Sequence, residues 1–134
     1  MEVKIRKRKI VLVGTGFVGM SFAYSLLSEK GINELVLIDM NKDKAIGEQM
    51  DLSDGLPYAD SKMTIKAGDY GECADADIVV ITAGAAQKPG QTRLELVGIN
   101  ARITKDVATQ VRMSGFSGIL VVASNPVDIM TYVA

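Results

Sequence analysis

The 134-residue chain contains no histidine and a single cysteine, Cys73, and aromatic residues make up only 5% of it. Without an imidazole, the chain cannot complete chemistry that needs a histidine base or ligand. One cysteine excludes an internal disulfide and any zinc site built from several cysteines. We therefore expect a cytoplasmic protein without a bound metal. Hydrophobic residues make up 48% and charged residues 23%, which is typical of one globular domain.

An uncharged stretch at 10–28 follows a basic N-terminus and superficially resembles a signal peptide. Three glycines interrupt this stretch, and Gly14 and Gly16 would break a membrane helix. No other apolar run approaches the ~20 residues that a membrane helix needs. We therefore expect neither a targeting segment nor a membrane partner.

The basic N-terminus also raises the question of nucleic-acid binding. Residues 1–9 carry five basic groups against Glu2, and the rest of the chain holds 10 basic and 15 acidic residues. A basic head is typical of nucleic-acid tails, but this chain has few aromatic residues and no second basic cluster. We interpret residues 1–8 as a solvated lead-in to the first strand and expect no nucleic-acid partner. The five basic residues are Lys4, Arg6, Lys7, Arg8 and Lys9.

Beyond this lead-in, apolar runs alternate with amphipathic segments. Strands are expected at 10–13, 34–38, 63–66, 77–82 and 118–123, and helices at 17–30, from 41 towards 52, and from 94 to the glycine at 115. Strands that are apolar throughout predict a parallel sheet covered on both faces. Right-handed crossovers then make this sheet doubly wound. The sequence therefore predicts a single α/β domain of the Rossmann type over residues 1–134.

Helical spacing predicts which residues of these helices face the sheet. In the first helix Val18, Phe22 and Leu26 share one face, and Asn41 is placed to cap the second helix. In the last helix a stripe of apolar residues recurs at spacings of 3, 4, 4 and 4. This stripe consists of Leu96, Ile99, Ile103, Val107 and Val111.

A glycine motif of the form GxGxxG joins the first expected strand to the first helix. Its residues are Gly14, Thr15, Gly16, Phe17, Val18 and Gly19. Such a motif is also found in tight turns without a ligand, but its place between a strand and a helix is what dinucleotide binding requires. In that context the first glycine makes the turn, the second lets a pyrophosphate approach the backbone, and the third lets helix and strand pack closely. The helix N-terminus would favour the anion.

Asp39 ends the second strand, 20 residues after Gly19, which is the place expected for a ligand of the cofactor ribose. Helix capping is the alternative role, for which Asn41 is better placed. A carboxylate at this point accepts hydrogen bonds from a 2′-hydroxyl and repels a 2′-phosphate, by up to about 4 kcal/mol at ~4 Å and an effective dielectric constant of 20. The sequence therefore predicts NAD rather than NADP as the cofactor.

Two loops follow the fourth expected strand. Thr82, Ala83 and Gly84 are small, so a cofactor can lie close to the backbone at the carboxyl end of the sheet; a tight loop without a ligand is the alternative. Residues 87–90, of sequence Gln-Lys-Pro-Gly, are typical of a hinged lid over a site.

Arg93 opens the last long helix, where a cation opposes the helix dipole by roughly 0.3–1 kcal/mol. Either solvent compensates this cost, or Arg93 faces the cofactor cleft and polarises a bound carbonyl. Asn125 directly follows the last strand. It can hold a substrate oxygen at the carboxyl end of the sheet or simply start an Asn-Pro turn.

Together these stretches resemble the N-terminal, cofactor-binding half of the L-lactate/malate dehydrogenase family, and within it the bacterial L-lactate dehydrogenases. The resemblance begins near Arg8 and covers nearly all of the chain. It is specific, because several spaced motifs occur in the same order. The matching stretches are 13–19, 37–39, 82–84, 87–90 with 92–94, and 124–128.

The resemblance implies roles for three residues. Arg93 matches the loop arginine that polarises the ketone as hydride arrives from the nicotinamide. Asn125 matches the asparagine that binds the substrate oxygen beside the cofactor, before a proline whose peptide is usually cis. Gln87 matches the position that selects the substrate: glutamine suits pyruvate or lactate, whereas malate enzymes have arginine there to pair a second carboxylate. An unpaired carboxylate in a closed site would be costly.

The chain departs from the usual family pattern at Asp54, at Gln91 in the loop, and at 98–99, none of which is a catalytic position. Family members are over twice as long, and their second half supplies a His–Asp acid/base pair and a substrate-binding arginine. We therefore expect the NAD-binding half of an L-lactate dehydrogenase, lacking the substrate domain, which binds NAD(H) without turning over pyruvate or lactate. The resemblance implies a homotetrameric parent, with part of its interface around 45–54.

Two alternatives stay open. The parent can be a malate or 2-hydroxyisocaproate dehydrogenase, which substrate comparison separates. The chain can also be a non-enzymatic NAD-sensing module, which would need the residues from Gly14 to Asp39 but has no use for Gln87, Arg93 or Asn125.

Overall fold

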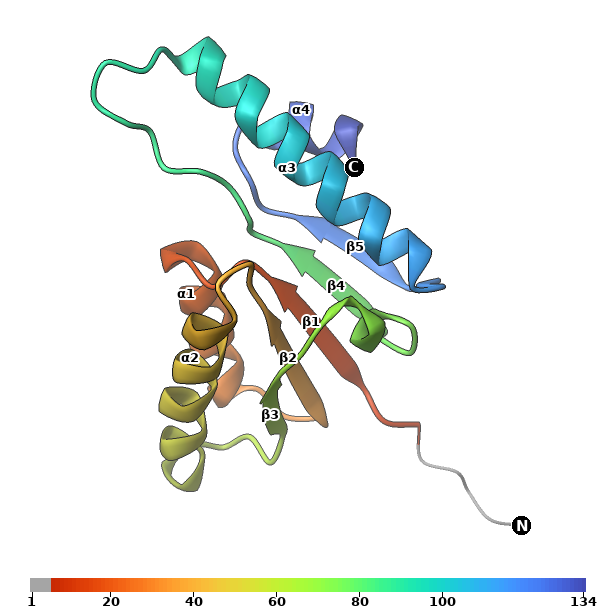
Figure 1. Cartoon of the computed structure of the whole chain (residues 1–134). Helices are drawn as coiled ribbons and strands as arrows, with labels where there is room; N and C mark the ends of the chain where they lie inside the picture. The colour runs from red at the N-terminus through yellow and green to blue at the C-terminus, as the bar shows by residue number, and fades with distance from the viewer. Residues whose placement is uncertain (1–5) are drawn as a thin grey trace.

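The apolar runs of the sequence form a five-stranded, entirely parallel sheet in the computed structural model, which describes residues 6–134 (Figure 1). The strands are β1 (Lys9–Val13), β2 (Glu34–Ile38), β3 (Thr64–Ala67), β4 (Ile78–Ile81) and β5 (Ile119–Val122). Their order across the sheet is β3-β2-β1-β4-β5, so the chain starts in the middle and builds outward to both edges. The predicted doubly wound Rossmann-type sheet is thereby confirmed, and each strand lies within two residues of its predicted bounds.

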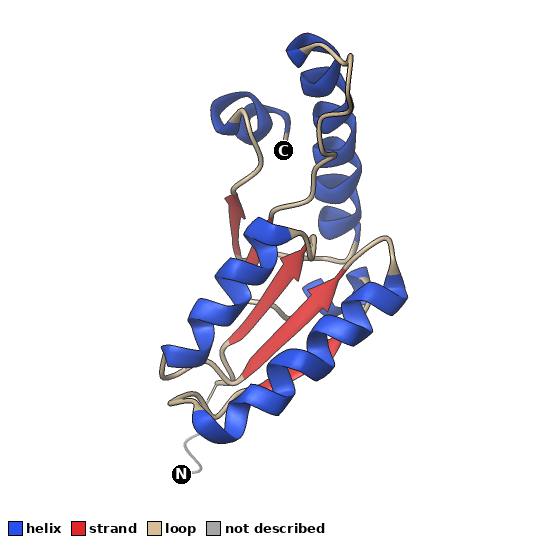
Figure 2. Cartoon of the chain, turned by 90° about the vertical axis from the view of Figure 1, so that its left-hand side faces the viewer, coloured by secondary structure: helices blue, strands red, loops and turns tan. Residues whose placement is uncertain are grey.

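Helices cover both faces of this sheet. They are α1 (Phe17–Ser25), α2 (Lys42–Gly55), α3 (Arg93–Met113) and α4 (Val127–Val133), with the short 3₁₀ segments η1 (Leu26–Ser28), η2 (Leu56–Tyr58) and η3 (Tyr70–Cys73). Figure 2 shows α1 and α2 side by side in front of the sheet, whereas α3 lies on the far side. The Asn41 side chain accepts a hydrogen bond from the Lys44 N–H and caps α2, as the sequence predicted.

The strands are apolar throughout because each face of the sheet has its own core. Successive strand residues point to opposite faces. Ile10 and Leu12 of β1 therefore join the core beneath α1 and α2, and Val11 and Val13 join the core beneath α3. The helices contribute Ala23, Leu26, Leu27 and Leu52 to the first core and Val107, Ala108 and Val111 to the second.

The first helix is shorter than the predicted 17–30. It ends at Ser25 and tightens into η1, and the chain is extended again at Glu29. Leu26 is buried and Phe22 is partly buried, but Val18 is 59% exposed. Val18 was wrongly predicted to face the core, because the first turn of α1 lies at the carboxyl end of the sheet rather than over it.

The interior stripe of α3 also differs from the prediction at one position. Ile99 is 36% exposed, and Asn100 is buried in its place, with 7% of its surface exposed. Helical spacing from Leu96 allows the next interior residue to be either i+3, which is Ile99, or i+4, which is Asn100. The sequence prediction chose Ile99 because it is the more hydrophobic of the two. Thr104, Val107 and Val111 complete the buried face of the helix.

The predicted helical cover on both faces of the sheet does not extend to one face of β5. In this edge strand Ile119 is 64% exposed and Val121 is 41% exposed. The reason is that α1 and α2 pack over the opposite edge of the sheet, which β3, β2 and β1 form (Figure 2). Leu120, which points to the opposite face, packs against the core beneath α3.

Lys9, the last of the five basic residues near the N-terminus, begins β1 one residue before the predicted start of the strand. It is only 6% exposed. Its ammonium group lies 2.7 Å from Glu72, 2.6 Å from Asp75 and 3.6 Å from Glu34. Residues 1–5, including Lys4, lie outside the described part of the chain. Across residues 6–134, no helix has the length and apolar character needed to cross a membrane.

Candidate functional site

The turn between β1 and α1 is closed by two glycines that allow close backbone contact. Gly14 has φ +105°, which only glycine adopts easily, and its N–H donates to the Ile38 carbonyl at 2.8 Å. A Cβ on Gly14 would lie 2.6 Å from the backbone nitrogen of Ala83, and one on Gly19 would overlap the Gly14 carbonyl oxygen. The glycine turn is therefore packed directly against the exit of β4 and the start of α1.

Gly16 differs from these two glycines because, apart from its immediate chain neighbours, no atom of the described residues lies within 4 Å of the place where its Cβ would be. It precedes α1, whose N-terminus has no side-chain cap and no acidic residue in its first turn. Free N–H groups at a helix N-terminus favour an anion. The open space at Gly16 therefore lies where the pyrophosphate of a dinucleotide would be expected. Phe17, which is 97% exposed, and Val18 begin the helix there.

Asp39 follows the end of β2 and is held in place by the glycine turn. One carboxylate oxygen accepts hydrogen bonds from the Thr15 N–H at 2.9 Å and the Thr15 hydroxyl at 2.7 Å, and the other accepts from the Asn41 N–H at 2.8 Å. Thr15 is itself buried. Burial raises the pKa of Asp39, but these hydrogen bonds and the charge of Lys44 outweigh it and lower the pKa. The carboxylate is therefore fixed and ionised at neutral pH.

A cavity of about 720 Å³ opens at the carboxyl ends of the strands, between the glycine turn and α3. Six of the predicted cofactor residues line it: Gly14, Gly16, Asp39, Thr82, Ala83 and Gly84. The Thr82 hydroxyl donates to the Gly14 carbonyl at 2.8 Å, which ties the exit of β4 to the glycine turn. The cavity lies between β1 and β4, where strand order reverses, and this is where doubly wound sheets bind nucleotides.

Several lining residues were missed in the sequence. Tyr70, at the start of η3, lines the cavity. Its pKa is raised, mainly by burial and to a smaller extent by nearby negative charges. The α3 wall includes Asp106 and Gln110, which lie beside the apolar stripe at helical spacing from Ile103. That spacing was a usable signal, whereas Tyr70 comes from a short 3₁₀ segment without a periodic pattern. The other missed residues are Met40, Lys42, Lys44, Gly68 and Asp69.

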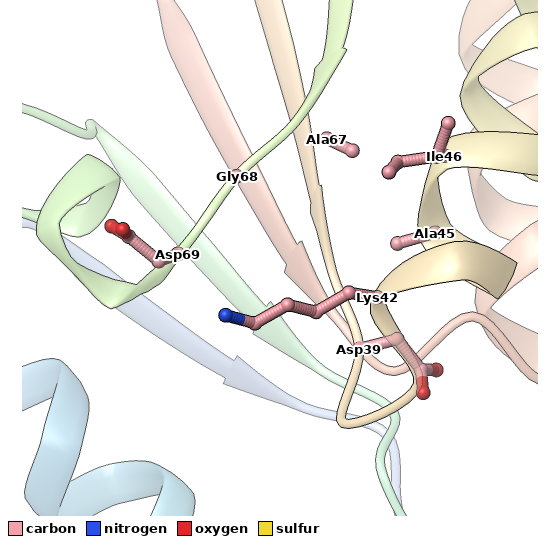
Figure 3. Close-up of a pocket in the computed structure, with 7 residues that line it drawn as sticks. All are labelled: Asp39, Lys42, Ala45, Ile46, Ala67, Gly68 and Asp69. Carbon is pink, nitrogen blue, oxygen red and sulfur yellow. The ribbon is translucent and has the colours of Figure 1, made fainter.

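A smaller hollow of about 190 Å³ adjoins the cavity on the α2 side of Asp39 (Figure 3). In Figure 3 the Lys42 side chain reaches across from α2 towards the chain at Gly68 and Asp69, while the Asp39 carboxylate points away from it. Asp69 accepts a hydrogen bond from the Gly71 N–H and so caps η3. The hollow therefore borders the larger cavity and shares Asp39, Lys42, Gly68 and Asp69 with it.

The three residues predicted to handle substrate do not line the cavity. Arg93 is the exposed first residue of α3, beyond the long loop that leaves β4 (Figure 1). The Gln87 amide donates to the Gln91 carbonyl, and the Gln91 side chain accepts from the Lys88 N–H, so the loop is folded on itself. Asn125 is exposed after β5, and its peptide bond to Pro126 is cis.

Among the residues that the structure describes, no three His, Cys, Asp or Glu side chains are grouped so that they could hold a metal ion. The site is instead built from backbone groups, small residues and one fixed carboxylate. These are the features of a dinucleotide-binding domain of the Rossmann class.

Comparison with known proteins identifies the family within this class. Residues 8–134 match the lactate/malate dehydrogenase NAD-binding domain, and the chain belongs to that family. NAD is therefore the cofactor of this domain.

The most similar relatives include L-lactate dehydrogenases. One from Lactococcus lactis subsp. cremoris is 59% identical over 132 residues, which are 98% of this chain and 42% of that protein. L-lactate dehydrogenase 2 of Enterococcus faecalis is 54% identical over the same shares. The chain thus spans about two fifths of the length of these relatives.

Solved structures give the same fold. The minor L-lactate dehydrogenase from Enterococcus mundtii in its ligands-bound form superposes with a TM-score of 0.92 at 55% identity, over 96% of this chain and 41% of that one. A malate dehydrogenase from Archaeoglobus fulgidus in complex with NADH has a TM-score of 0.87 at 39% identity, over 93% of this chain and 43% of that one.

Proposed function

We propose that the chain forms the cofactor-binding part of an NAD-dependent L-lactate dehydrogenase, which interconverts pyruvate and L-lactate. The observation that carries this proposal is the match of nearly the whole chain to L-lactate dehydrogenases at 54–59% identity. The cavity lined by the glycine turn and Asp39 supports it. Bound NAD supplies the chemistry of hydride transfer, and the residues of this chain bind and orient it.

In the proposed binding mode the pyrophosphate lies over Gly16 at the N-terminus of α1, beside Phe17 and Val18. The ribose next to the adenine donates its hydroxyl hydrogen bonds to Asp39, which Thr15 keeps in position. The small residues 82–84 let the cofactor lie against the backbone, and Gly19 allows the helix to begin close to the turn.

In this proposal the substrate is bound by Gln87, Arg93 and Asn125, which lie outside the cofactor cavity. The Gln87 amide is hydrogen-bonded to the Gln91 carbonyl within the 87–92 loop. In this proposal, closure of the loop brings Gln87 to the substrate methyl group and Arg93 to the ketone oxygen. Asn125 holds the same oxygen from the β5 side. A neutral Gln87 favours pyruvate over oxaloacetate, since the second carboxylate of oxaloacetate would lack a partner.

The 134 residues hold no histidine, so they provide no imidazole for the proton step. Arg93 and Asn125 stabilise charge but do not transfer a proton. We therefore propose that the chain by itself binds NAD(H) without catalysing turnover.

Titration of the purified chain with NADH, followed by cofactor fluorescence, tests the binding proposal. We expect saturable binding of NADH and much weaker binding of NADPH. Loss of NADH absorbance is then followed with pyruvate and with oxaloacetate separately. Steady turnover of pyruvate would contradict our account of the proton step, and failure to bind NADH would contradict the proposed function itself.

A chimera tests the substrate. Residues 8–134 replace the corresponding domain of the Lactococcus lactis enzyme, and we expect the chimera to reduce pyruvate. In the same chimera Gln87→Arg should shift preference towards oxaloacetate, and Arg93→Ala should abolish turnover while NADH binding persists. Preference of the unmutated chimera for oxaloacetate or for a branched 2-keto acid would identify a malate or 2-hydroxyisocaproate enzyme. Unchanged turnover in the Arg93 variant would contradict the catalytic role.

The cellular setting follows from the same proposal. We propose a cytoplasmic protein, which agrees with the buried free thiol of Cys73, and a homotetrameric parent enzyme. Light scattering of the chimera measures its oligomeric state.

A further inference from the structure

The interior face of α3 buries one amide side chain beside Thr104 and the apolar residues of the helix. Asn100 is 7% exposed, while the neighbouring Ile99 is turned partly to solvent. Buried polar groups are hydrogen-bonded with few exceptions, and Asn100 follows this rule. Its side-chain oxygen accepts the backbone N–H of Ala85 at 2.8 Å. Asn100 therefore joins α3 to the loop that leaves β4.

Two further side chains hold the same loop. The Thr82 hydroxyl donates to the Gly14 carbonyl at 2.8 Å, and the hydroxyl of Ser124, which is 6% exposed, donates to the Ala83 carbonyl at 2.7 Å. The backbone of 82–85 is thus connected to the glycine turn, to the end of β5 and, through Asn100, to α3. Among the described hydrogen bonds of residues 82–85, that of Ala85 to Asn100 is the one that reaches α3.

This connection bears on the cavity because the loop and the helix are two of its walls. Residues 82–84 line one side, and Ile103, Val107 and other residues of α3 line the other. Small loop residues have few side-chain atoms with which to fix their distance from a helix. A Cβ on Gly84 would lie 3.4 Å from the Asn100 side-chain oxygen. A methyl group at Gly84 would thus only touch the amide, and the direct contact between loop backbone and amide is the 2.8 Å hydrogen bond from Ala85, which sets the spacing of the two walls.

Asn100 also shares a helix face with Arg93. The two residues are seven apart, which is close to two full turns of an α-helix. Helical spacing therefore puts Arg93 near the side of α3 that carries Asn100, and the hydrogen bond to Ala85 joins this side to the loop. A leucine at position 100 would fill the space but could not accept this hydrogen bond.

We propose that Asn100 is a positioning residue of the NAD site, which sets the width of the cofactor cavity by anchoring the 82–85 loop to α3. This inference rests on the proposed binding of NAD by the chain. Asn100 acts through the loop backbone and is not required to touch the cofactor.

The test compares the unmodified chain with three variants. Asn100→Leu removes the acceptor and keeps an apolar group of similar size. Asn100→Asp keeps an acceptor oxygen at the same reach. Asn33→Leu is a matched control, because the Asn33 side-chain oxygen also accepts a backbone N–H, that of Arg8, at 2.8 Å, but at the amino end of the sheet. NADH affinity is measured by fluorescence titration, and exchange of the Ala85 amide proton is measured by NMR without cofactor.

We expect Asn100→Leu to raise the Kd for NADH by about three- to tenfold, the effect of one lost hydrogen bond, and to accelerate exchange of the Ala85 amide. Asn100→Asp should restore slow exchange of that amide, which a general loss of packing would not allow. Asn33→Leu should leave the Kd within about twofold, well below the effect of one lost hydrogen bond.

Two results would overturn the inference alone: NADH binding by Asn100→Leu equal to that of the unmodified chain, or equally fast Ala85 exchange in the Asp and Leu variants. Failure of the unmodified chain to bind NADH would overturn the proposed function, and the inference with it.

Discussion

At the scale of single residues, glycine is required at some positions of the chain and could be replaced at others. Gly14 and Gly19 have backbone or hydroxyl atoms where a side chain would have to lie, whereas Gly47 in α2 has open space around it. The same residue type therefore has opposite consequences for stability at these positions.

Gly19→Ala should destabilise the chain by about 1–3 kcal/mol, because the new methyl group overlaps the Gly14 carbonyl and the Thr82 hydroxyl. Gly47→Ala is the matched control, and it should stabilise the chain by about 0.5–1 kcal/mol through helix propensity. Urea unfolding followed by circular dichroism measures both free energies. Equal effects of the two substitutions would show that the close contact at Gly19 is unimportant.

Asp39 gives the second prediction at this scale. Asp39→Asn keeps the size of the side chain and removes its charge, so NADH should bind about tenfold more weakly. NADPH should bind better than before, because repulsion of its 2′-phosphate is lost. Fluorescence titration with both cofactors measures the ratio of their dissociation constants. Asp51→Asn on the exposed face of α2 is the control. An unchanged NADH/NADPH ratio in the Asp39 variant would refute the ribose assignment.

At the scale of elements, a charge network joins the amino-terminal half of the sheet to η3. Lys9 of β1 lies between Glu72 and Asp75, and Lys66 of β3 contacts Glu34 at 3.0 Å and Glu72 at 3.1 Å. Burial lowers the pKa of Lys9, but its hydrogen bonds to Asp75 and Glu72 outweigh this and raise it well above the ordinary value. The hydrogen bonds from Lys9 lower the pKa of both carboxyls.

The network predicts a pH window for stability. The carboxyl pKa values are lowered by folding, so their contribution is present above the unfolded pKa values, about 4, and is lost as pH falls through the folded values. The Lys9 pKa is raised by folding, so its contribution is complete below about 10.4 and is lost as pH rises further. Urea midpoints measured from pH 3 to pH 11 should therefore form a plateau that falls at both ends.

Lys9→Met should lower the plateau by about 1–3 kcal/mol, the range of hydrogen bonds to charged groups, and should flatten the acid limb. Lys7→Met removes an exposed charge and should change little. An unaltered acid limb in the Lys9 variant would show that the network does not couple folding to pH.

At the scale of the whole molecule, β5 is an edge strand whose outer side pairs with no other strand of residues 6–134, and its own residues carry no charge. Ile119 and Val121 are exposed beside it. An open strand edge without charged residues favours pairing with another chain. We expect association of the isolated chain that increases with concentration, measured by analytical ultracentrifugation. Val121→Lys, on the exposed face, should reduce it, whereas a monomer at all concentrations would contradict this expectation.

Much of this architecture was predictable because local patterns determine it. Buried β-branched runs defined the strands, and the order of strands and helices defined the doubly wound sheet. The glycine spacing and the strand-end position of Asp39 singled out residues that line the larger cavity. The first turn of α1 and the uncovered face of β5 were mispredicted, since burial depends on which helix covers which strand.

The sequence by itself determined the parallel sheet, the glycine turn and the strand-end carboxylate, because each follows from residues close together in the chain. Only the tertiary structure decided that Asn100 rather than Ile99 faces inward, that Tyr70 and Asp106 meet in one cavity, and that the buried Lys9 joins a network of ion pairs. These features depend on contacts between residues far apart in sequence, and helical or strand periodicity carries no information about such contacts.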